Sequence, residues 1–210
     1  HSKQWIGAAI TESGAKRCAT KHTGIGFVSL SDEIRVKTAL EASRLAKRWS
    51  LFFCDIEGVN GWIAAIREAG LDYVRTLVWD KVDSAPQFTG DRPANSAECA
   101  VLAHPPGRKR WNGGGKHGMW THPIVKPQTG DRLHTTQKPL ALMCELVEDF
   151  TDPGDLILDP FAGSGTTGLA ARILGRRFVG CELKPSYWAT ACGNLDKAVG
   201  LRDGLTLFAS

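Results

Sequence analysis

The sequence predicts a single α/β domain, residues 1–210, in which helices cover both faces of a doubly wound, mostly parallel sheet. Three observations predict this fold class. The chain has 210 residues, which suits one domain with one core and is short for two. Short apolar runs alternate with segments of helical spacing, a pattern that favours strands joined by crossover helices. A glycine-rich turn, Gly163 to Gly168, stands where one apolar run meets one such helix.

The first half of the chain predicts two helices and three strands. Residues 1–30 have no clear period. Ser31 and the two acids after it read as an N-cap and an acidic first turn, so a helix begins there and runs to Arg48. The apolar run Ser50–Asp55 suits a buried parallel strand. The other expected elements are a helix over Gly58–Ala69 and strands over Val74–Lys81 and Ala97–His104.

The second half continues the alternation. Pro139 suits the first turn of a helix, and the apolar residues after it recur at helical spacing until a Pro-Gly pair at 153–154. The elements expected after this helix are, in order, a strand, a helix, a strand and a helix: Leu156–Leu158, Gly165–Leu174, Phe178–Glu182 and Pro185–Val199.

Composition excludes several classes of protein. Hydrophobic residues make up 42% of the chain, which is ordinary globular usage and excludes a disordered chain. No apolar run approaches the roughly 18 residues of a membrane span, and the first residues lack the pattern of a signal peptide. We therefore expect a cytoplasmic protein that does not bind a membrane.

The cysteines and histidines give little sign of a metal. The six cysteines form no Cys-x-x-Cys pair, and several lie in apolar stretches, where a buried thiol is the usual occupant. His117 and His122 have a spacing that could serve a metal, but no cysteine or carboxylate partner is close in sequence. We expect no metal site.

Positive charge is concentrated in one segment. The chain carries a formal net charge of +4, whereas Pro105–Lys138 alone carries +6, with ten glycines or prolines and with Trp111 and Trp120 among the charges. A basic loop with interleaved aromatic residues is typical of nucleic-acid binding, and a solvated surface loop is the alternative. We expect the loop 105–133 to contact DNA through four residues: Arg108, Lys109, Arg110 and Lys116.

The glycine-rich turn predicts a cofactor site. Gly163, Gly165 and Gly168 form a G-x-G-x-x-G pattern between a strand and a helix, and Glu182 ends the next strand 19 residues after Gly163. The glycines let a ligand approach the backbone, and a carboxylate there can accept hydrogen bonds from ribose hydroxyls; a generic strand-to-helix turn is the alternative. A dinucleotide and S-adenosylmethionine both fit this pattern. Asp159 favours the second, since its carboxylate suits a cationic sulfonium ligand.

Three segments together resemble a known family. Asp159–Gly168, preceded by His134–Leu140 and followed by Gly180-Cys181-Glu182, is similar to the β arrangement of exocyclic-amino DNA methyltransferases. The resemblance is strong over 134–190 and looser over 78–81 and 92–102. It implies a Rossmann-like methyltransferase fold and S-adenosylmethionine as cofactor. The cofactor-binding residues that the motifs and the resemblance together predict are Asp159, Pro160, Phe161, Gly163, Gly165, Thr166, Glu182, His134, Thr136, Gln137, Lys138 and Pro139.

The same resemblance implies an activity. Members transfer a methyl group from S-adenosylmethionine to adenine N6 or cytosine N4 of a base flipped out of double-stranded DNA, and we expect adenine N6 first. A variable loop in this family reads the target sequence, and the basic segment occupies its position.

One expected motif is missing. The family's catalytic tetrapeptide, Asp-Pro-Pro-Tyr or a close variant, does not occur in the 210 residues, and the one Pro-Pro pair, Pro105-Pro106, has neither the acceptor nor the aromatic neighbour. The resemblance implies that the tetrapeptide, and the strand before it, would precede His1. Two alternatives stay open: a noncatalytic relative that binds DNA or cofactor, and a nicotinamide-dependent oxidoreductase that uses the Gly163 turn.

Overall fold

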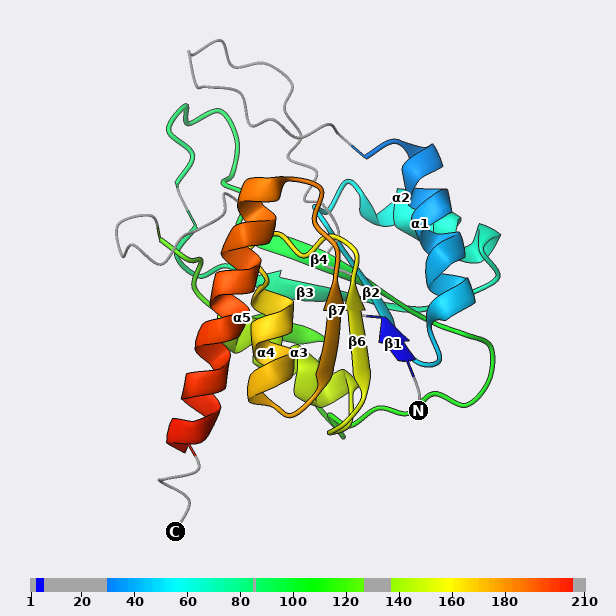
Figure 1. Cartoon of the computed structure of the whole chain (residues 1–210). Coiled ribbons are helices and arrows are strands. Elements are labelled where there is room, and N and C mark those ends of the chain that lie inside the picture. The colour runs from blue at the N-terminus through cyan, green and yellow to red at the C-terminus, as the bar shows by residue number, and fades with distance from the viewer. Residues whose placement is uncertain (1–2, 6–29, 85, 127–136, 206–210) are drawn as a thin grey trace.

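The structure is a computed structural model that describes residues 3–5, 30–84, 86–126 and 137–205 (Figure 1). Strands and helices alternate along most of the chain, as the sequence predicts. The elements are β1 Lys3–Trp5, α1 Asp32–Leu45, β2 Ser50–Cys54, α2 Val59–Glu68, β3 Asp72–Asp80, β4 Ala97–His104, β5 Met119–Thr121, α3 Leu140–Phe150, β6 Leu156–Asp159, α4 Thr166–Ile173, β7 Arg177–Gly180 and α5 Pro185–Leu205.

The strands form two adjoining sheets. One has the order β1-β6-β7 and is parallel throughout. The other has the order β2-β4-β3-β5, in which β4 runs antiparallel to β2 and β3 while β5 runs parallel to β3. Contacts between β1 and β2 bring the two sheets together (Figure 1). Three of the five pairings among the described strands are parallel, so the predicted α/β class with a mostly parallel sheet is confirmed.

One strand prediction needs correction, and two strands were not predicted. The run Ser50–Asp55 forms a buried strand as predicted, but its described partner β4 is antiparallel to it. The reason lies in the connection between β3 and β4. Its described residues, within 81–96, form no crossover helix, and β4 turns back to pair antiparallel with β3, from Asp80 opposite Ala97, and with β2 on its other side. The strands β1 and β5 were not predicted, because three residues are too few to show a period.

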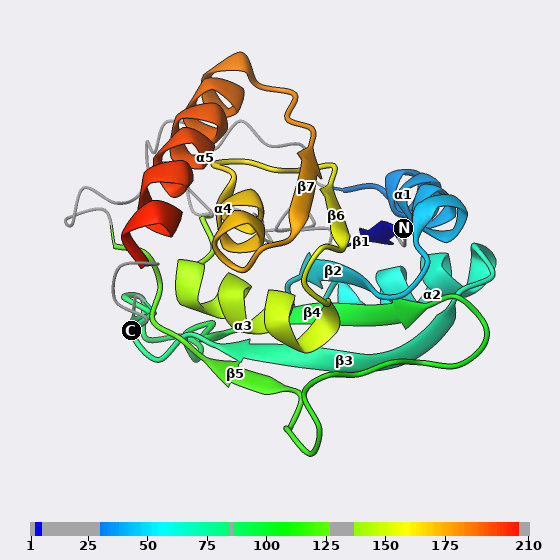
Figure 2. The ribbon, with the colours of Figure 1, turned by 60° about the horizontal axis from the view of Figure 1, so that its bottom comes forward.

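The helices form where the sequence predicts them and cover the sheets on both sides, but α1 ends at Leu45 and not at Arg48. The Ser31 hydroxyl accepts a hydrogen bond from the Ile34 amide at 3.3 Å, which confirms the N-cap of α1. Helices α1 and α2 lie on one side of the sheets and α3, α4 and α5 on the other (Figures 1 and 2). The largest fully buried side chains come from β2, α2, α3 and β6: Trp62, Phe52, Phe53, Phe150, Leu51, Ile66, Leu142, Met143, Leu146 and Ile157. No helix in the described part of the chain is long and apolar enough to cross a membrane.

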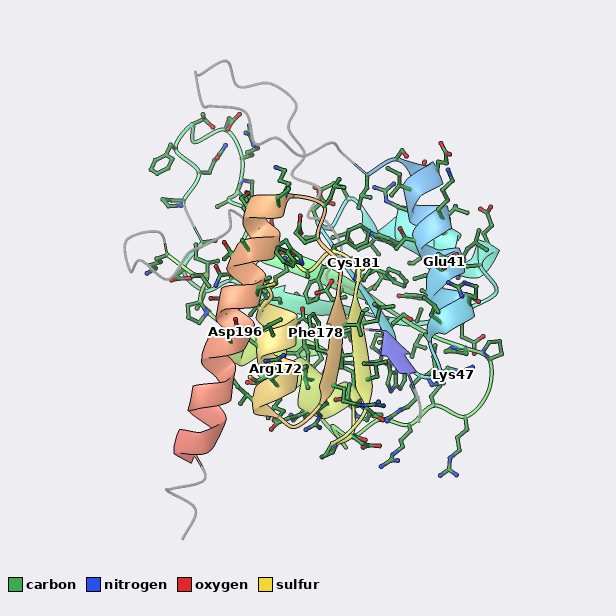
Figure 3. All side chains as sticks on the ribbon, viewed as in Figure 1. Glu41, Lys47, Arg172, Phe178, Cys181 and Asp196 are labelled. Carbon is green, nitrogen blue, oxygen red and sulfur yellow. The ribbon has the colours of Figure 1, made fainter. Side chains whose placement is uncertain are left out.

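The parallel strands define two edges of the molecule. We call the side where β6 and β7 end the carboxyl edge, and the side where they begin the amino edge. In Figure 3, Cys181, just after β7, lies above Lys47, which comes just before β2. Arg48 confirms that β2 begins at the amino edge, because its guanidinium lies 3.0 Å from Asp152 and 3.2 Å from Asp155, which directly precede β6.

The remaining elements can be assigned to these edges. Helix α3 ends at Phe150, shortly before β6 begins, so it starts at the carboxyl edge. Strand β4 ends at the amino edge, because Ala103 pairs with Ser50 at the start of β2. Strand β3 therefore runs toward the carboxyl edge, and so does β5, which is parallel to it.

Candidate cofactor site at the carboxyl edge

Asp159 organises the turn between β6 and α4. Its side chain is completely buried, one carboxylate oxygen accepts from the Phe161 amide at 3.0 Å, and the other accepts from the Thr167 hydroxyl at 2.7 Å. Its backbone carbonyl accepts from the Cys181 amide at 2.9 Å. The carboxylate thus ties the end of β6 to the first turn of α4. Its attraction for a cationic ligand, which the sequence analysis expects, stays a prediction.

The glycines of the turn are required by backbone conformation and by close packing. Gly163 and Gly165 have φ of +55° and +81°, values that other residues adopt only with strain. A Cβ at Gly165 would lie 2.9 Å from the Cβ and 3.0 Å from the Cα of Ala191, and one at Gly168 would lie 2.6 Å from the Phe178 ring. At these two positions the close neighbour is the protein itself, so part of the glycine pattern reflects packing against α5 and β7.

Glu182 lies beside the glycine turn, as the sequence predicts. One oxygen of its carboxylate accepts from the Gly163 amide at 2.9 Å and the other from the Lys184 amide at 2.9 Å. A carboxylate offers about four acceptor positions, so each oxygen keeps capacity for another donor. The side chain is only half-buried, which leaves it accessible to a ligand. The geometry suits a pair of ribose hydroxyls.

The other predicted residues of the turn lie at the same edge. Pro160 and Phe161 are half-buried, and Thr166 is buried with its hydroxyl 3.3 Å from that of Ser164. His134 and Thr136 lie outside the described residues. Directly before α3 come Gln137, Lys138 and Pro139, at the carboxyl edge where that helix starts. Helix α3 packs against α4, which starts at the same edge directly after the glycine turn (Figure 2).

The Lys138 side chain takes part in an ion pair that the sequence analysis did not predict. Its ammonium lies 2.5 Å from the Glu98 carboxylate on β4, and both side chains are buried. Lys81 approaches the other oxygen of Glu98 at 3.0 Å. The sequence signal that could have revealed the pair is an acid in the apolar strand Ala97–His104, because a buried carboxylate needs a cation.

The charges keep Glu98 ionised. Burial raises the pKa of its carboxyl, but the ammonium groups of Lys138 and Lys81 lower it by more, so the pKa lies below its ordinary value. The ionised carboxylate and the two ammonium groups carry a net charge of +1 beside the start of α3.

The basic residues predicted to contact DNA lie at the other edge. The segment 105–118 follows β4 and lies at the amino edge, where the Trp49 indole donates to the Arg110 carbonyl and Asn112 contacts the loop before β6. Strand β5 then returns the chain to the carboxyl edge. The expected loop is therefore divided between the two edges, and Arg108, Lys109, Arg110 and Lys116 are separated from the cofactor residues.

Three of these four basic side chains are paired with acids. Lys109 lies 2.6 Å from Asp72, Arg110 lies 2.9 Å from Asp152, and Lys116 lies 2.7 Å from the buried carboxylate of Asp149. Arg108 is exposed, and the structure shows no ion pair for it among the described residues. DNA contact by the four residues stays a prediction, and Arg108 is the member best placed to meet a phosphate.

The described residues contain no cluster of three metal-ligating side chains. His122, one of the two histidines with a suggestive spacing, lies 3.1 Å from Glu145 instead. Cys54 and Cys99 are buried thiols, whereas Cys181 is exposed next to Glu182.

Comparison with known sequences gives a family and curated relatives. The profile of the DNA methylase family of N6 and N4 methyltransferases matches residues 32–192. The type II methyltransferase M.XycI of Xanthomonas campestris pv. cyanopsidis is 32% identical over 154 residues, which cover 67% of this chain and 50% of that protein. The type II methyltransferase M.HinfI of Haemophilus influenzae is 28% identical over 128 residues, 53% of this chain and 36% of that protein. The chain thus matches half or less of the length of these relatives.

Comparison with solved structures gives the same fold. The crystal structure of the M1.HpyAVI–SAM complex superposes with a TM-score of 0.73 at 24% identity, over 93% of this chain and 89% of that one. The PvuII DNA methyltransferase, described as cytosine-N4-specific, superposes with a TM-score of 0.71 at 15% identity, over 96% of this chain and 85% of that one.

Proposed function

From the premise that this chain belongs to the N6/N4 DNA methylase family, we propose that it is an S-adenosylmethionine-dependent DNA methyltransferase that acts on an exocyclic amine of a base. The observation that carries the proposal is the Glu182 carboxylate fixed against the Gly163 amide at the carboxyl edge. This arrangement presents acceptors for ribose hydroxyls beside a turn that a ligand can approach.

The cofactor residues fall into two groups in this proposal. Glu182 accepts from the ribose, and the turn residues Pro160 to Thr166 line the ligand. Phe161 offers an aromatic face to the sulfonium, a cation that such a face attracts. Gln137, Lys138 and Pro139 border the site from the start of α3, and His134 and Thr136 complete the predicted set. S-adenosylmethionine supplies an activated methyl group when bound.

Methyl transfer to an exocyclic amine needs groups that the catalytic tetrapeptide of the family supplies. The bond from sulfur to the methyl carbon breaks as the bond from that carbon to the amine nitrogen forms, and the amine releases a proton. The amine is conjugated with its ring and is a poor nucleophile, so it needs acceptors for its protons and a surface on which the flipped base can stack. The tetrapeptide that supplies both in the family is absent from the 210 residues.

The proposed substrate is double-stranded DNA with a flipped base, and the proposed target is adenine N6, with cytosine N4 as the second candidate. The resemblance to the family supports both amines. The PvuII enzyme is a cytosine-N4 enzyme of the same fold, so the fold does not separate them.

The cofactor can be tested by thermal unfolding. S-adenosylmethionine at about 100 times its Kd should add roughly 2.7 kcal/mol to the free energy of unfolding, which raises the Tm of a domain of this size by about 5–10 °C. NAD at the same concentration should leave the Tm unchanged. A rise with NAD and none with S-adenosylmethionine would establish the oxidoreductase instead. A rise with S-adenosylmethionine, without methyl incorporation into DNA under any of the conditions described below, would favour the noncatalytic relative.

The DNA contact of the basic residues can be tested by salt dependence. Each phosphate contact contributes about 0.9 to the slope of log K against log salt. We expect Arg108→Ala to reduce the slope by about that amount, and Lys109→Ala and Lys116→Ala to reduce it less, because an internal carboxylate already neutralises each ammonium. Measuring DNA binding by fluorescence anisotropy from low to moderate salt gives the slopes. An unchanged slope in all three variants would support the alternative that the segment is a solvated surface loop.

A further inference from the structure

We propose that Glu98 is a positioning residue for cofactor binding, which holds the start of α3 in place through its buried ion pair with Lys138. This inference rests on the proposed function and adds to it a residue on β4, outside the stretch 134–190 where the resemblance is strong.

The first support is the geometry of the ion pair. Glu98 is 3% exposed, and its two oxygens lie 2.5 Å from the Lys138 ammonium and 3.0 Å from the Lys81 ammonium. The Lys138 side chain is 8% exposed and that of Lys81 is 19% exposed. The carboxylate therefore has one cation on each oxygen, with Lys138 on the more deeply buried side.

The second support is the aromatic surroundings of the pair. The Lys138 ammonium lies 5.1 Å from the centre of the Phe53 ring and 5.8 Å from that of Trp79, and the Lys81 ammonium lies 5.0 Å from the Trp79 ring. The Trp79 indole donates to the His122 carbonyl at 2.8 Å, which fixes its ring. Water is largely excluded here, so loss of Glu98 would leave the buried Lys138 ammonium without a compensating charge. The Lys138 side chain is therefore confined to its position beside Glu98.

The third support is that α3 starts without a side-chain cap. Pro139 occupies the N-cap position, no side chain in the described residues caps the helix, and its first turn has no acid. Helices that begin at buried positions need some other means of fixing their first turn. The residue directly before Pro139 is Lys138, so its ion pair with β4 supplies that restraint.

The consequence concerns the cofactor site. Helices α3 and α4 pack together and start at the same edge, α4 directly from the glycine turn. Movement of the start of α3 would therefore widen or close the space in front of that turn. Glu98 acts on the cofactor through Lys138, without touching the ligand.

The test compares two buried acids that pair with lysines near opposite ends of α3. Glu98, on β4, pairs near its start, and Asp149 pairs near its end. Asp149 is 3% exposed and pairs with Lys116 at 2.7 Å near the end of the helix, so Asp149→Asn is a matched control for Glu98→Gln. Both variants should lower the Tm. We expect Glu98→Gln alone to weaken S-adenosylmethionine binding, by about tenfold or more in calorimetry, and to speed hydrogen exchange of the amides of residues 143–146, which donate to the first carbonyls of the helix as Met143 does to Pro139.

A double-mutant cycle separates positioning from direct contact. If Lys138 acts through Glu98, the variant Glu98→Gln/Lys138→Gln should bind S-adenosylmethionine no more weakly than the worse single variant. Additive losses would show that Lys138 meets the ligand directly, and losses in Asp149→Asn equal to those in Glu98→Gln would show a general effect on stability. Either result overturns the proposal.

The hydrogen-exchange measurement also separates this inference from the proposed function. If the wild-type chain binds no S-adenosylmethionine, the proposed function fails, and exchange at residues 143–146 then decides alone whether Glu98 holds the start of α3. Unchanged exchange in Glu98→Gln would overturn that claim whatever the ligand is.

Discussion

Replacing residues 6–9 by Asp-Pro-Pro-Tyr is expected to raise methyl transfer to duplex DNA at least about 100-fold over the unaltered 210-residue chain, a change of roughly 2.7 kcal/mol in the barrier. Strand β1 runs parallel to β6, from Lys3 opposite Leu156 to Trp5 opposite Leu158. Strand β1 therefore ends at the carboxyl edge, the edge at which β6 leads into the glycine turn. A tetrapeptide there would place proton acceptors and an aromatic ring where the methyl donor is proposed to bind.

Labelled-methyl incorporation measures this effect, and digestion of the product to nucleosides identifies the methylated amine. The control variant carries Ala-Pro-Pro-Ala at residues 6–9 and should remain at background. A second variant carries Asp-Pro-Pro-Tyr in an extension before His1, the place that the sequence analysis expects. Because β1 begins at the amino edge, with Lys3 opposite Leu156, we expect an extension before it to restore less transfer. Background transfer by both tetrapeptide variants, with both ligands bound, would contradict the proposed chemistry.

The second large effect concerns Glu182. Glu182→Ala removes the carboxylate that accepts from the Gly163 amide and that is proposed to accept from the ribose. Hydrogen bonds to a charged group contribute about 1.5–3 kcal/mol, so the affinity for S-adenosylmethionine should fall roughly 10- to 100-fold. Isothermal titration calorimetry measures the loss. The fold should persist, because the Glu182 side chain is only half-buried and does not belong to the hydrophobic core.

Two further variants make the Glu182 result specific. Glu182→Gln keeps one acceptor oxygen and should lose less affinity than Glu182→Ala. Glu41→Ala removes an exposed acid of α1, whose described partner is Arg44 on the same helix, and should bind S-adenosylmethionine as the wild-type chain does. An unchanged Kd in Glu182→Ala would remove Glu182 from the site.

Local signals explain which parts of the fold the sequence could predict. The Ser31 cap, the Ala97–His104 strand and the Gly163–Gly168 turn each depend on neighbours within a few residues, and each forms as predicted. Strand direction depends on partners far along the chain, so the antiparallel pairing of Ser50–Cys54 was not accessible. The same holds for β5, which pairs with β3 through three residues.

The site shows the same division. Glu182 reaches the Gly163 amide because the parallel strands β6 and β7 end side by side, which the motif spacing implies. Glu98 and Lys138 are 40 residues apart and meet only through the packing of α3 on the second sheet. The acids that neutralise the basic segment are equally distant in sequence, as Lys109 with Asp72 illustrates. Charge counted along a segment therefore overstates the field that the folded segment produces.

Helix α3 is held at both ends by ion pairs, Lys138 with Glu98 at its start and Lys116 with Asp149 at its end. Eleven residues of helix span about 16 Å as a nearly rigid rod, so the two anchors share one mechanical element. A polyanion that competes with Asp149 for Lys116 would release the end of the rod far from the glycine turn and leave the start held by Glu98. Coupling between two ligands is reciprocal, so DNA bound at that far end should leave the affinity for the methyl donor unchanged, and the donor should leave the affinity for DNA unchanged.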